Sequence, residues 1–278
     1  MILRFKHRNI DLSSRTHIMG ILNVTPDSFS DGGKFLGFQN AVDQGMKMIQ
    51  EGADIIDVGG ESTRPGSDPV SLEEELSRVI PVISSLAQKT EVPISIDTYK
   101  SEVAGRALEA GAQMINDISA LRFDPEMKKV VSESKVPIVL MHIKGTPKDM
   151  QKDPSYDDVI GEVRDYLRDS LGIAQRVGIA KDRIIIDPGI GFGKRLEDNL
   201  NILKKLREFS ILGCPILIGC SRKAFIGRIL DLPVQERLEG SLAALAVAVM
   251  NGANIVRVHD VKESKRVAGL VDAVRRTD

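Results

Sequence analysis

The sequence predicts a single α/β domain, a (β/α)8 barrel in which eight parallel strands alternate with helices. Eight short segments rich in valine and isoleucine are each followed by a segment whose apolar residues have helical spacing. Within these repeats no strand follows another directly, as the strands of an antiparallel pair would. Gly-Ala pairs begin at Gly52, Gly111 and Gly252, each just before a strand, where a helix would end. A doubly wound open sheet is the competing topology, and both folds place ligands at the carboxyl ends of their strands.

The first half of the chain contains an N-terminal segment and four strand-helix units. Residues 1–15 read as a polar β segment, which we expect to cover the closed end of a barrel formed by residues 16–278. Ser71, with Glu74 three residues later, has the spacing of a capping box and marks the start of the second helix. The predicted strands are 17–22, 53–58, 93–97 and 113–118, and the predicted helices are 39–51, 71–89, 100–110 and 125–134.

The second half contains four more units. The predicted strands are 137–142, 183–187, 215–219 and 255–259, and the predicted helices are 156–177, 197–209, 235–251 and 262–275. Residues 220–233 are predicted as a loop. Residues 238–250 are apolar nearly all round, whereas a surface helix of a lone barrel should have a polar face. We therefore expect this helix to form a homodimer contact, with burial beneath the N-terminal segment as the alternative.

Composition limits the possible partners and compartments. The 278 residues suit one barrel, and a hydrophobic content of 42% is enough for a large core. A net charge of -1 provides no field to hold nucleic acid or an anionic membrane, so we expect neither as a partner. Residues 1–11 lack the apolar region of a signal sequence and no apolar run is long enough to span a membrane, so we expect a cytoplasmic protein. Cys214 and Cys220 lack metal or redox spacing and are interpreted as reduced packing residues.

Three polar residues end three different predicted strands. Asp97, Asn116 and Asp187 would therefore meet at the rim of one barrel. Carboxylates accept paired N–H donors, so this set suits the edge of a flat nitrogen heterocycle. The alternative is that each residue caps the helix after it, which is about as probable as a binding role for any one of them. Three such residues at equivalent strand ends favour binding.

The candidate cations are Arg64, Lys223 and Arg257, with His259 two residues after Arg257 and so on the same face of its strand. Together with the Thr63 hydroxyl they are suited to a phosphate group, because arginine binds phosphate through two parallel N–H groups. The alternative for each cation is an ion pair; the candidate partners are Asp57, Glu61 and Asp260.

The glycine-rich stretch from Gly189 to Lys194 has neither the spacing of a P-loop nor that of a dinucleotide fingerprint. Phe192 within it could pack on a planar ligand or, about equally, in the core. No His, Cys or Glu cluster has zinc spacing, so we expect no tightly held transition metal. Magnesium bound mainly through substrate phosphates needs only one or two protein oxygens, which Asn23 and its loop could provide.

Five motifs together resemble those of dihydropteroate synthase, in the order in which that family has them. They are NVTPDSFSDGG at 23–33, GGESTRPG at 59–66, DPGIGFGK at 187–194, SRK at 221–223 and RVH at 257–259. The resemblance implies a (β/α)8 barrel, usually a homodimer, and a target of sulfonamides. It implies an enzyme of folate biosynthesis that joins (7,8-dihydropterin-6-yl)methyl diphosphate to p-aminobenzoate.

The resemblance also implies roles for individual residues. The pterin would be held by Asp97, Asn116, Asp187 and Lys223 in a slot lined by Met141, Phe192 and Gly219. The diphosphate would be held by Thr63, Arg64, Arg257 and His259, with Asn23 binding Mg2+ and Asp31 a possible second metal contact. The p-aminobenzoate pocket would contain Phe29, Pro65 and Ser221. The residues expected to be catalytic are Asp97, Asp187, Lys223, Arg64, Arg257 and His259, acting in a dissociative mechanism.

Two other functions fit parts of the pattern. A pterin-binding methyltransferase domain, which passes a methyl group to a corrinoid, has the same barrel and acids. The long loop at 23–33 and the SRK motif at 221–223 argue against it. A catalytically silent pterin-binding subunit is the second alternative, and the charged residues expected on both sides of the cavity argue against that.

Overall fold

A computed structural model of the chain describes residues 1–6, 8–24 and 33–277. Its main sheet consists entirely of parallel strands. In spatial order they are β8 (Ile184–Asp187), β7 (Ile138–Met141), β6 (Met114–Asp117), β5 (Ile94–Asp97), β4 (Ile55–Gly59), β3 (His17–Asn23), β10 (Ile255–Val258) and β9 (Leu217–Ile218). A parallel bridge between Ile186 and Ile216 joins the two ends of this order. The strands thus close into the predicted barrel.

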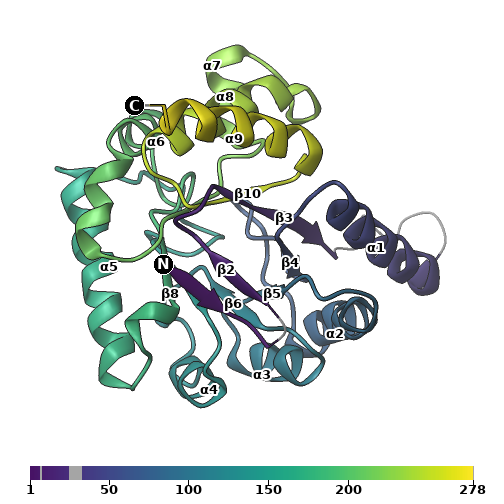
Figure 1. The fold of residues 1–278 in the computed structure, drawn as a ribbon. Helices are drawn as coiled ribbons and strands as arrows, with labels where there is room; N and C mark the ends of the chain where they lie inside the picture. Colours follow the sequence, from purple (N-terminus) through teal and green to yellow (C-terminus); the bar gives the residue numbers. More distant parts are fainter. Residues whose placement is uncertain (7, 25–32, 278) are drawn as a thin grey trace.

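Helices surround the strands on their outer side, as Figure 1 shows. They are α1 (Gly33–Gln50), α2 (Leu72–Lys89), α3 (Ser101–Glu109), α4 (Met127–Ser134), α5 (Val159–Arg176), α6 (Leu196–Lys204), α7 (Ala224–Leu230), α8 (Leu238–Met250) and α9 (Val261–Arg275). Short 3-10 turns lie at Lys181–Arg183, Leu206–Leu212 and Val234–Glu236. No helix in the described part of the chain is both long and apolar enough to cross a membrane.

The N-terminal segment forms an antiparallel hairpin of β1 (Ile2–Arg4) and β2 (Asn9–Asp11). Its apolar side chains, Leu3 and Ile10, pack with Leu12 against residues in the first part of the barrel strands. Figure 1 shows the hairpin, in purple, lying across the near end of the strands. The hairpin closes the amino-terminal end of the barrel as predicted, and the site must lie at the other end.

Side chains along each strand alternate between the barrel interior and the layer of helices, because a β-strand repeats every two residues. A buried apolar layer fills the interior near the hairpin; its strand members are Met19, Ile55, Met114, Val139, Ile185, Leu217 and Ile255. The residues two positions later along these strands are Ile21, Asp57, Asn116, Met141, Asp187, Gly219 and Arg257. Four of these seven residues are polar or charged, and five of the seven are predicted site residues: Asn116, Met141, Asp187, Gly219 and Arg257. We call this second interior layer the polar layer.

The structure corrects three details of the predicted helices. Residues 224–230 form α7, so the prediction of a loop over 220–233 is wrong there; Phe225 and Ile226 are buried and anchor this short helix. The helix predicted at 39–51 begins at Gly33. The capping box at Ser71 is only half formed: Ser71 accepts the Glu74 N–H at 3.2 Å, but the Glu74 carboxylate pairs with Arg78 instead.

Candidate active site

A continuous network of hydrogen bonds links four strands in the polar layer. Asn116 on β6 donates to Asp57 Oδ2 on β4 at 2.9 Å. Arg257 on β10 donates through Nε to the same oxygen and through Nη2 to Asp97 Oδ2 on β5, both at 2.6 Å. The barrel therefore brings Asp97 and Asn116 to one rim, as predicted, and it places Arg257, which was expected beside the diphosphate, between Asp57 and Asp97. The ion-pair alternative for Arg257 is also present, with Asp57 as its partner.

Two carboxylate oxygens in this network are buried and accept no hydrogen bond from any described residue: Asp57 Oδ1 and Asp97 Oδ1. A buried oxygen without a donor costs about 1–3 kcal/mol, so both are ready to accept N–H groups. Neither Asp97 nor Asn116 caps a helix, since the residues at the N-caps of α3 and α4 are Lys100 and Glu126. The helix-cap alternative does not account for these strand ends.

Charge in the network is set by burial and by mutual contact. Burial raises the pKa of Asp97. The positive charge of Arg257 opposes that rise, and the negative charge of Asp57 adds to it. Burial also works against the charge of Arg257, but Asp57 and Asp97 outweigh it and hold the pKa above its usual value. Arg257 therefore remains a cation in the middle of the acids.

Asp187 stands at the end of β8 with one oxygen already engaged. Its Oδ1 accepts the Gly189 N–H at 2.7 Å, a local turn contact that fixes the carboxylate and directs its other oxygen away from Gly189. Burial raises the pKa of Asp187 to about 6, against the effects of that N–H and of Lys223. Burial lowers the pKa of Lys223 to about 8, so near pH 7 Asp187 is mainly a carboxylate and Lys223 is mainly a cation.

An apolar surface lies beside these polar groups. Met141 and Phe192 are buried in one cluster, whose other members are Ile118, Ile143 and Met150, with Tyr99 at its edge. Lys223 Nζ lies 4.2 Å from the centroid of the Phe192 ring, within cation–π range. Phe192 thus packs in a core cluster and also borders the charged groups, so the two interpretations of this residue are compatible.

The loop after β4 carries Thr63, Arg64 and Pro65, and it is held from its first residues. Glu61 accepts hydrogen bonds from the Tyr99 hydroxyl at 2.7 Å and from Lys100 Nζ at 2.6 Å. Arg64 and Pro65 are exposed. The Arg64 guanidinium forms no hydrogen bond or ion pair with any residue that the structure describes. Within those residues, Arg64 therefore does not have the ion pair that was the alternative to phosphate binding.

Ser221 and His259 are in direct contact. Ser221 Oγ lies 2.9 Å from His259 Nδ1 and accepts the His259 backbone N–H at 3.2 Å. Burial, followed by the charge of Arg257, lowers the pKa of His259 to about 4. The imidazole is therefore neutral at pH 7, and it can offer a hydrogen bond rather than a positive charge.

Three predicted residues remain: Asn23, Phe29 and Asp31. Asn23 ends β3, pairs in register with Gly59 and is exposed. Phe29 and Asp31 fall outside the described residues.

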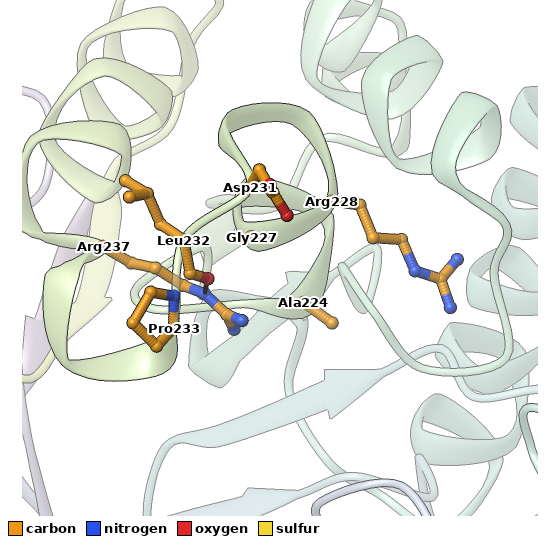
Figure 2. A pocket seen from close by; sticks show the side chains of 7 residues that line it. All are labelled: Ala224, Gly227, Arg228, Asp231, Leu232, Pro233 and Arg237. Atoms are coloured by element: carbon orange, nitrogen blue, oxygen red, sulfur yellow. Dashed lines mark hydrogen bonds between the residues drawn. The ribbon is translucent and has the colours of Figure 1, made fainter.

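A separate hollow of about 620 Å³ lies around α7, and Figure 2 shows its seven lining residues. They are Ala224, Gly227, Arg228, Asp231, Leu232, Pro233 and Arg237. None of these is a predicted site residue. Arg237 is engaged with the backbone carbonyls of Leu232 and Arg222, so it braces this turn. The hollow is not part of the rim described above.

Asp57, expected from the sequence only as an ion-pair partner of the cations, is the centre of the network and fully buried. The signal was present in the sequence: Asp57 follows Ile55 by two residues, as Asn116 follows Met114 and Asp187 follows Ile185. That common offset places Asp57, Asn116 and Asp187 in the same interior layer.

Comparison with known proteins agrees with this geometry. The family model described as pterin binding enzyme matches residues 19–259, a range that includes every predicted site residue. The curated dihydropteroate synthase of Synechocystis sp. is 50% identical over 267 residues, covering 96% of this chain and 92% of that protein.

Solved structures agree over the whole fold. Dihydropteroate synthase from Yersinia pestis, in a sulfonamide drug complex, has a TM-score of 0.94 at 43% identity and covers 100% of both chains. The Xanthomonas albilineans enzyme with 4-aminobenzoic acid has a TM-score of 0.93 at 45% identity, covering 100% of this chain and 99% of that one. In complex with 7,8-dihydropteroate the latter enzyme has a TM-score of 0.90 at 42% identity, with 100% of both chains covered.

Proposed function

The chain belongs to the dihydropteroate synthase family of pterin-binding enzymes, and we propose that the rim residues described above carry out the reaction of that family. The chain is a transferase that condenses (7,8-dihydropterin-6-yl)methyl diphosphate with p-aminobenzoate, giving 7,8-dihydropteroate and diphosphate in folate biosynthesis. The observation that carries the residue assignment is the network that joins Asn116, Asp57, Arg257 and Asp97 from four strands.

The acids would hold the pterin ring by its N–H edge. Asp97 and Asp187 each have one oxygen that is not used by the network or the local turn, and Asn116 is fixed by its bond to Asp57. Charge-assisted hydrogen bonds of this kind contribute about 1.5–3 kcal/mol each. Lys223 would donate to an acceptor on the same ring, which would rest against the apolar surface of Met141, Phe192 and Gly219.

The cations would hold the diphosphate. Arg64 is exposed on its loop, Arg257 keeps Nη1 outside its two ion pairs, and His259 supplies a neutral hydrogen bond. Thr63 and Asn23 would complete the diphosphate-binding part of the site. The amide oxygen of Asn23 suits magnesium, which would neutralise charge on the leaving group while diphosphate oxygens and water provide its other ligands. Pro65, Ser221 and Phe29 would contact p-aminobenzoate.

The mechanism follows from acids that would contact the ring and cations that would contact the diphosphate, with Arg257 joined to the acids by its ion pairs to Asp57 and Asp97. The bond between the pterin methylene carbon and the diphosphate oxygen breaks, and its electron pair leaves on diphosphate. Asp97 and Asp187 stabilise the positive charge that spreads into the ring, while Arg64 and Arg257 stabilise the departing anion. The aniline nitrogen then forms the new C–N bond and loses a proton. No covalent nucleophile is required.

Two incubations separate this function from its alternatives. Purified protein with the pterin diphosphate, p-aminobenzoate and magnesium should release diphosphate and form dihydropteroate, and chelation of the metal should slow release. Pterin binding without turnover would instead support a silent subunit. No dihydropteroate in that incubation, together with methyl transfer in a second incubation that supplies a methylated pterin and a corrinoid, would support the methyltransferase domain.

Pterin affinity should be highest between about pH 7 and pH 8. Asp97 and Asp187, whose pKa values are raised to about 7 and about 6, accept from the ring only as carboxylates, so affinity should fall as the pH drops through these values. Lys223, with a pKa of about 8, loses its positive charge at higher pH, so affinity should fall again there. Fluorescence titration with a pterin checks this profile. Lys223→Arg should remove the fall at high pH, and a flat profile in the wild type would contradict both assignments.

We further propose a homodimer formed through α8. Val247 and Met250 on its outer face are 45% and 43% exposed, and the neighbouring α9 exposes Leu270 and Val274. The N-terminal hairpin packs at the closed end of the barrel, so the alternative that it covers α8 is wrong. Burial of such a face in a second copy would remove apolar side chains from water.

Sedimentation at micromolar concentration should give a dimer, and Val247→Glu should shift it toward monomer because the interface would bury a charge. The control is Val177→Glu, at the apolar C-cap residue of α5, which is 37% exposed. A wild type that sediments as a monomer would remove the dimer proposal.

The proposed compartment is the cytoplasm. Both cysteines, Cys214 and Cys220, are buried and unpaired, as predicted. Buried free thiols are compatible with a reducing compartment.

A further inference from the structure

The loop between β8 and α6 carries Phe192 and has no regular secondary structure of its own. Gly189, Gly191 and Gly193 all have positive φ angles, of 72°, 84° and 61°. A Cβ atom at Gly189 would lie 2.0 Å from the His142 carbonyl oxygen, so the loop backbone runs directly against the end of β7. Its carbonyl groups cannot be satisfied within a helix or a sheet and must find partners elsewhere.

Three successive carbonyls of this loop each receive a side-chain donor. Gln151 Nε2 donates to Gly191 O at 2.7 Å, Lys194 Nζ donates to Phe192 O at 3.0 Å, and Tyr156 Oη donates to Gly193 O at 2.7 Å. The position of Phe192 is therefore set by its backbone contacts as well as by the packing of its ring. Among the three donors, only Lys194 reaches the carbonyl of Phe192 itself.

Lys194 also contacts the residue next to Met141. Its Nζ lies 2.8 Å from His142 Nδ1, and the two residues are buried, with Lys194 only 2% exposed. The His142 backbone N–H donates to Asp187 O at 2.9 Å, which fixes the end of β7 to β8. One amine thus connects the loop that carries Phe192 with the strand end that carries Met141.

Lys194 forms no ion pair with any residue in the described ranges, an expensive arrangement for a buried ammonium group. Burial lowers the pKa of Lys194 to about 7, with Asp187 opposing the shift and Lys223 adding to it. A neutral amine still has two N–H groups, which match the two acceptors on His142 and Phe192. An apolar side chain could fill this space without the cost of burying an amine, but it could not make the two contacts to His142 and Phe192.

We propose that Lys194 is a positioning residue for pterin binding, holding the Phe192 loop and the Met141 strand end in the relative arrangement that forms the apolar side of the slot. The inference rests on the proposed function, since that function assigns this surface to the pterin ring. Lys194 does not touch the ring; it acts through Phe192 and His142.

The test compares two variants that each remove a donor from adjacent carbonyls of the loop. Lys194→Met keeps the length of the side chain and removes both hydrogen bonds, so the dissociation constant for 6-hydroxymethylpterin should rise about tenfold. The Michaelis constant for p-aminobenzoate at saturating pterin diphosphate should not change. Tyr156→Phe removes only the donor to Gly193 O, so it should lower the melting temperature while leaving pterin affinity near that of the wild type.

A double-mutant cycle with Phe192→Ala separates positioning from general destabilisation. If Lys194 acts through Phe192, then Lys194→Met should cost little further pterin affinity in the Phe192→Ala background. An equal loss in both backgrounds would overturn the inference, and so would a Lys194→Met variant that binds pterin as tightly as the wild type.

His142 provides a second approach that leaves Lys194 unchanged. His142→Asn places an acceptor oxygen near the position of Nδ1 and should preserve affinity, whereas His142→Leu removes the acceptor and should weaken binding as Lys194→Met does. Equal affinity in these two variants would overturn the inference. If the wild type bound no pterin, both the proposed function and the positioning role would be overturned. If the wild type bound and turned over its substrates, and the variants bound pterin as tightly as the wild type, the positioning role alone would be overturned.

Discussion

Replacing Arg64 by alanine is expected to slow turnover by about 100- to 1000-fold, the usual loss when one group that stabilises a developing anion is removed. Arg64 is exposed and makes no hydrogen bond or ion pair through its guanidinium to the described residues, so its removal should cost the fold little. Pterin affinity should stay near that of the wild type, because Arg64 acts on the diphosphate and the second substrate. Steady-state kinetics and a separate pterin titration measure the two effects.

A lysine at position 64 separates the effect of the positive charge from that of the guanidinium geometry. Arg64→Lys keeps the charge but loses the two parallel N–H groups, so it should recover only part of the lost rate. Lys148, whose amine pairs with exposed Asp68 at 2.9 Å, offers a matched control, since Lys148→Ala removes a nearby surface cation without a proposed catalytic role. Equal losses in turnover and in pterin affinity for Arg64→Ala would contradict the assignment to the leaving group.

Asp187→Asn should weaken pterin binding by about 10- to 100-fold. Gly189 N–H holds Oδ1, so an asparagine would keep its oxygen on that N–H and turn its NH2 group toward the ring. A donor would then face a donor, and charge assistance would also be lost. Calorimetry with a pterin measures the change, and affinity equal to that of the wild type would remove Asp187 from the pterin site.

Asp117 supplies the control for a buried carboxylate at a strand end. It follows Asn116 on β6 but turns to the outer face, where its oxygens accept the N–H groups of Ser119 and Leu121 at 2.8 and 2.7 Å. Asp117→Asn should therefore reduce stability and leave pterin affinity nearly unchanged. A loss of affinity in Asp117→Asn as large as in Asp187→Asn would mean that both effects arise from general destabilisation.

Most of the barrel could be predicted from the sequence because its signals are local. Apolar runs closed by Asp97, Asn116 and Asp187 locate the strands and their carboxyl ends, and parallel strands bring those ends to one rim. Helix α7 could not be found in this way. It is one short element, and the glycine at 227 and the proline at 233 give its surroundings the composition of a loop.

The contacts within the site depend on how the barrel closes. Arg257 is 200 residues from Asp57 and 160 from Asp97, and the strand register of the closed sheet decides which carboxylates it reaches. The Lys194 contact with His142 spans 52 residues and depends on a loop with three left-handed glycines. Local patterns identify residues able to do chemistry, but they do not determine which of them pair.

The central claim is that acids from separate strands hold one pterin ring while Arg64 and Arg257 face its diphosphate. A crystal structure of this chain with a bound pterin tests it most directly. We predict the N–H edge of the ring on Asp97 and Asp187, with its flat face against Phe192 and Met141. A pterin bound elsewhere, with Asp57 and Asp97 still joined only to Arg257 and Asn116, would contradict the account.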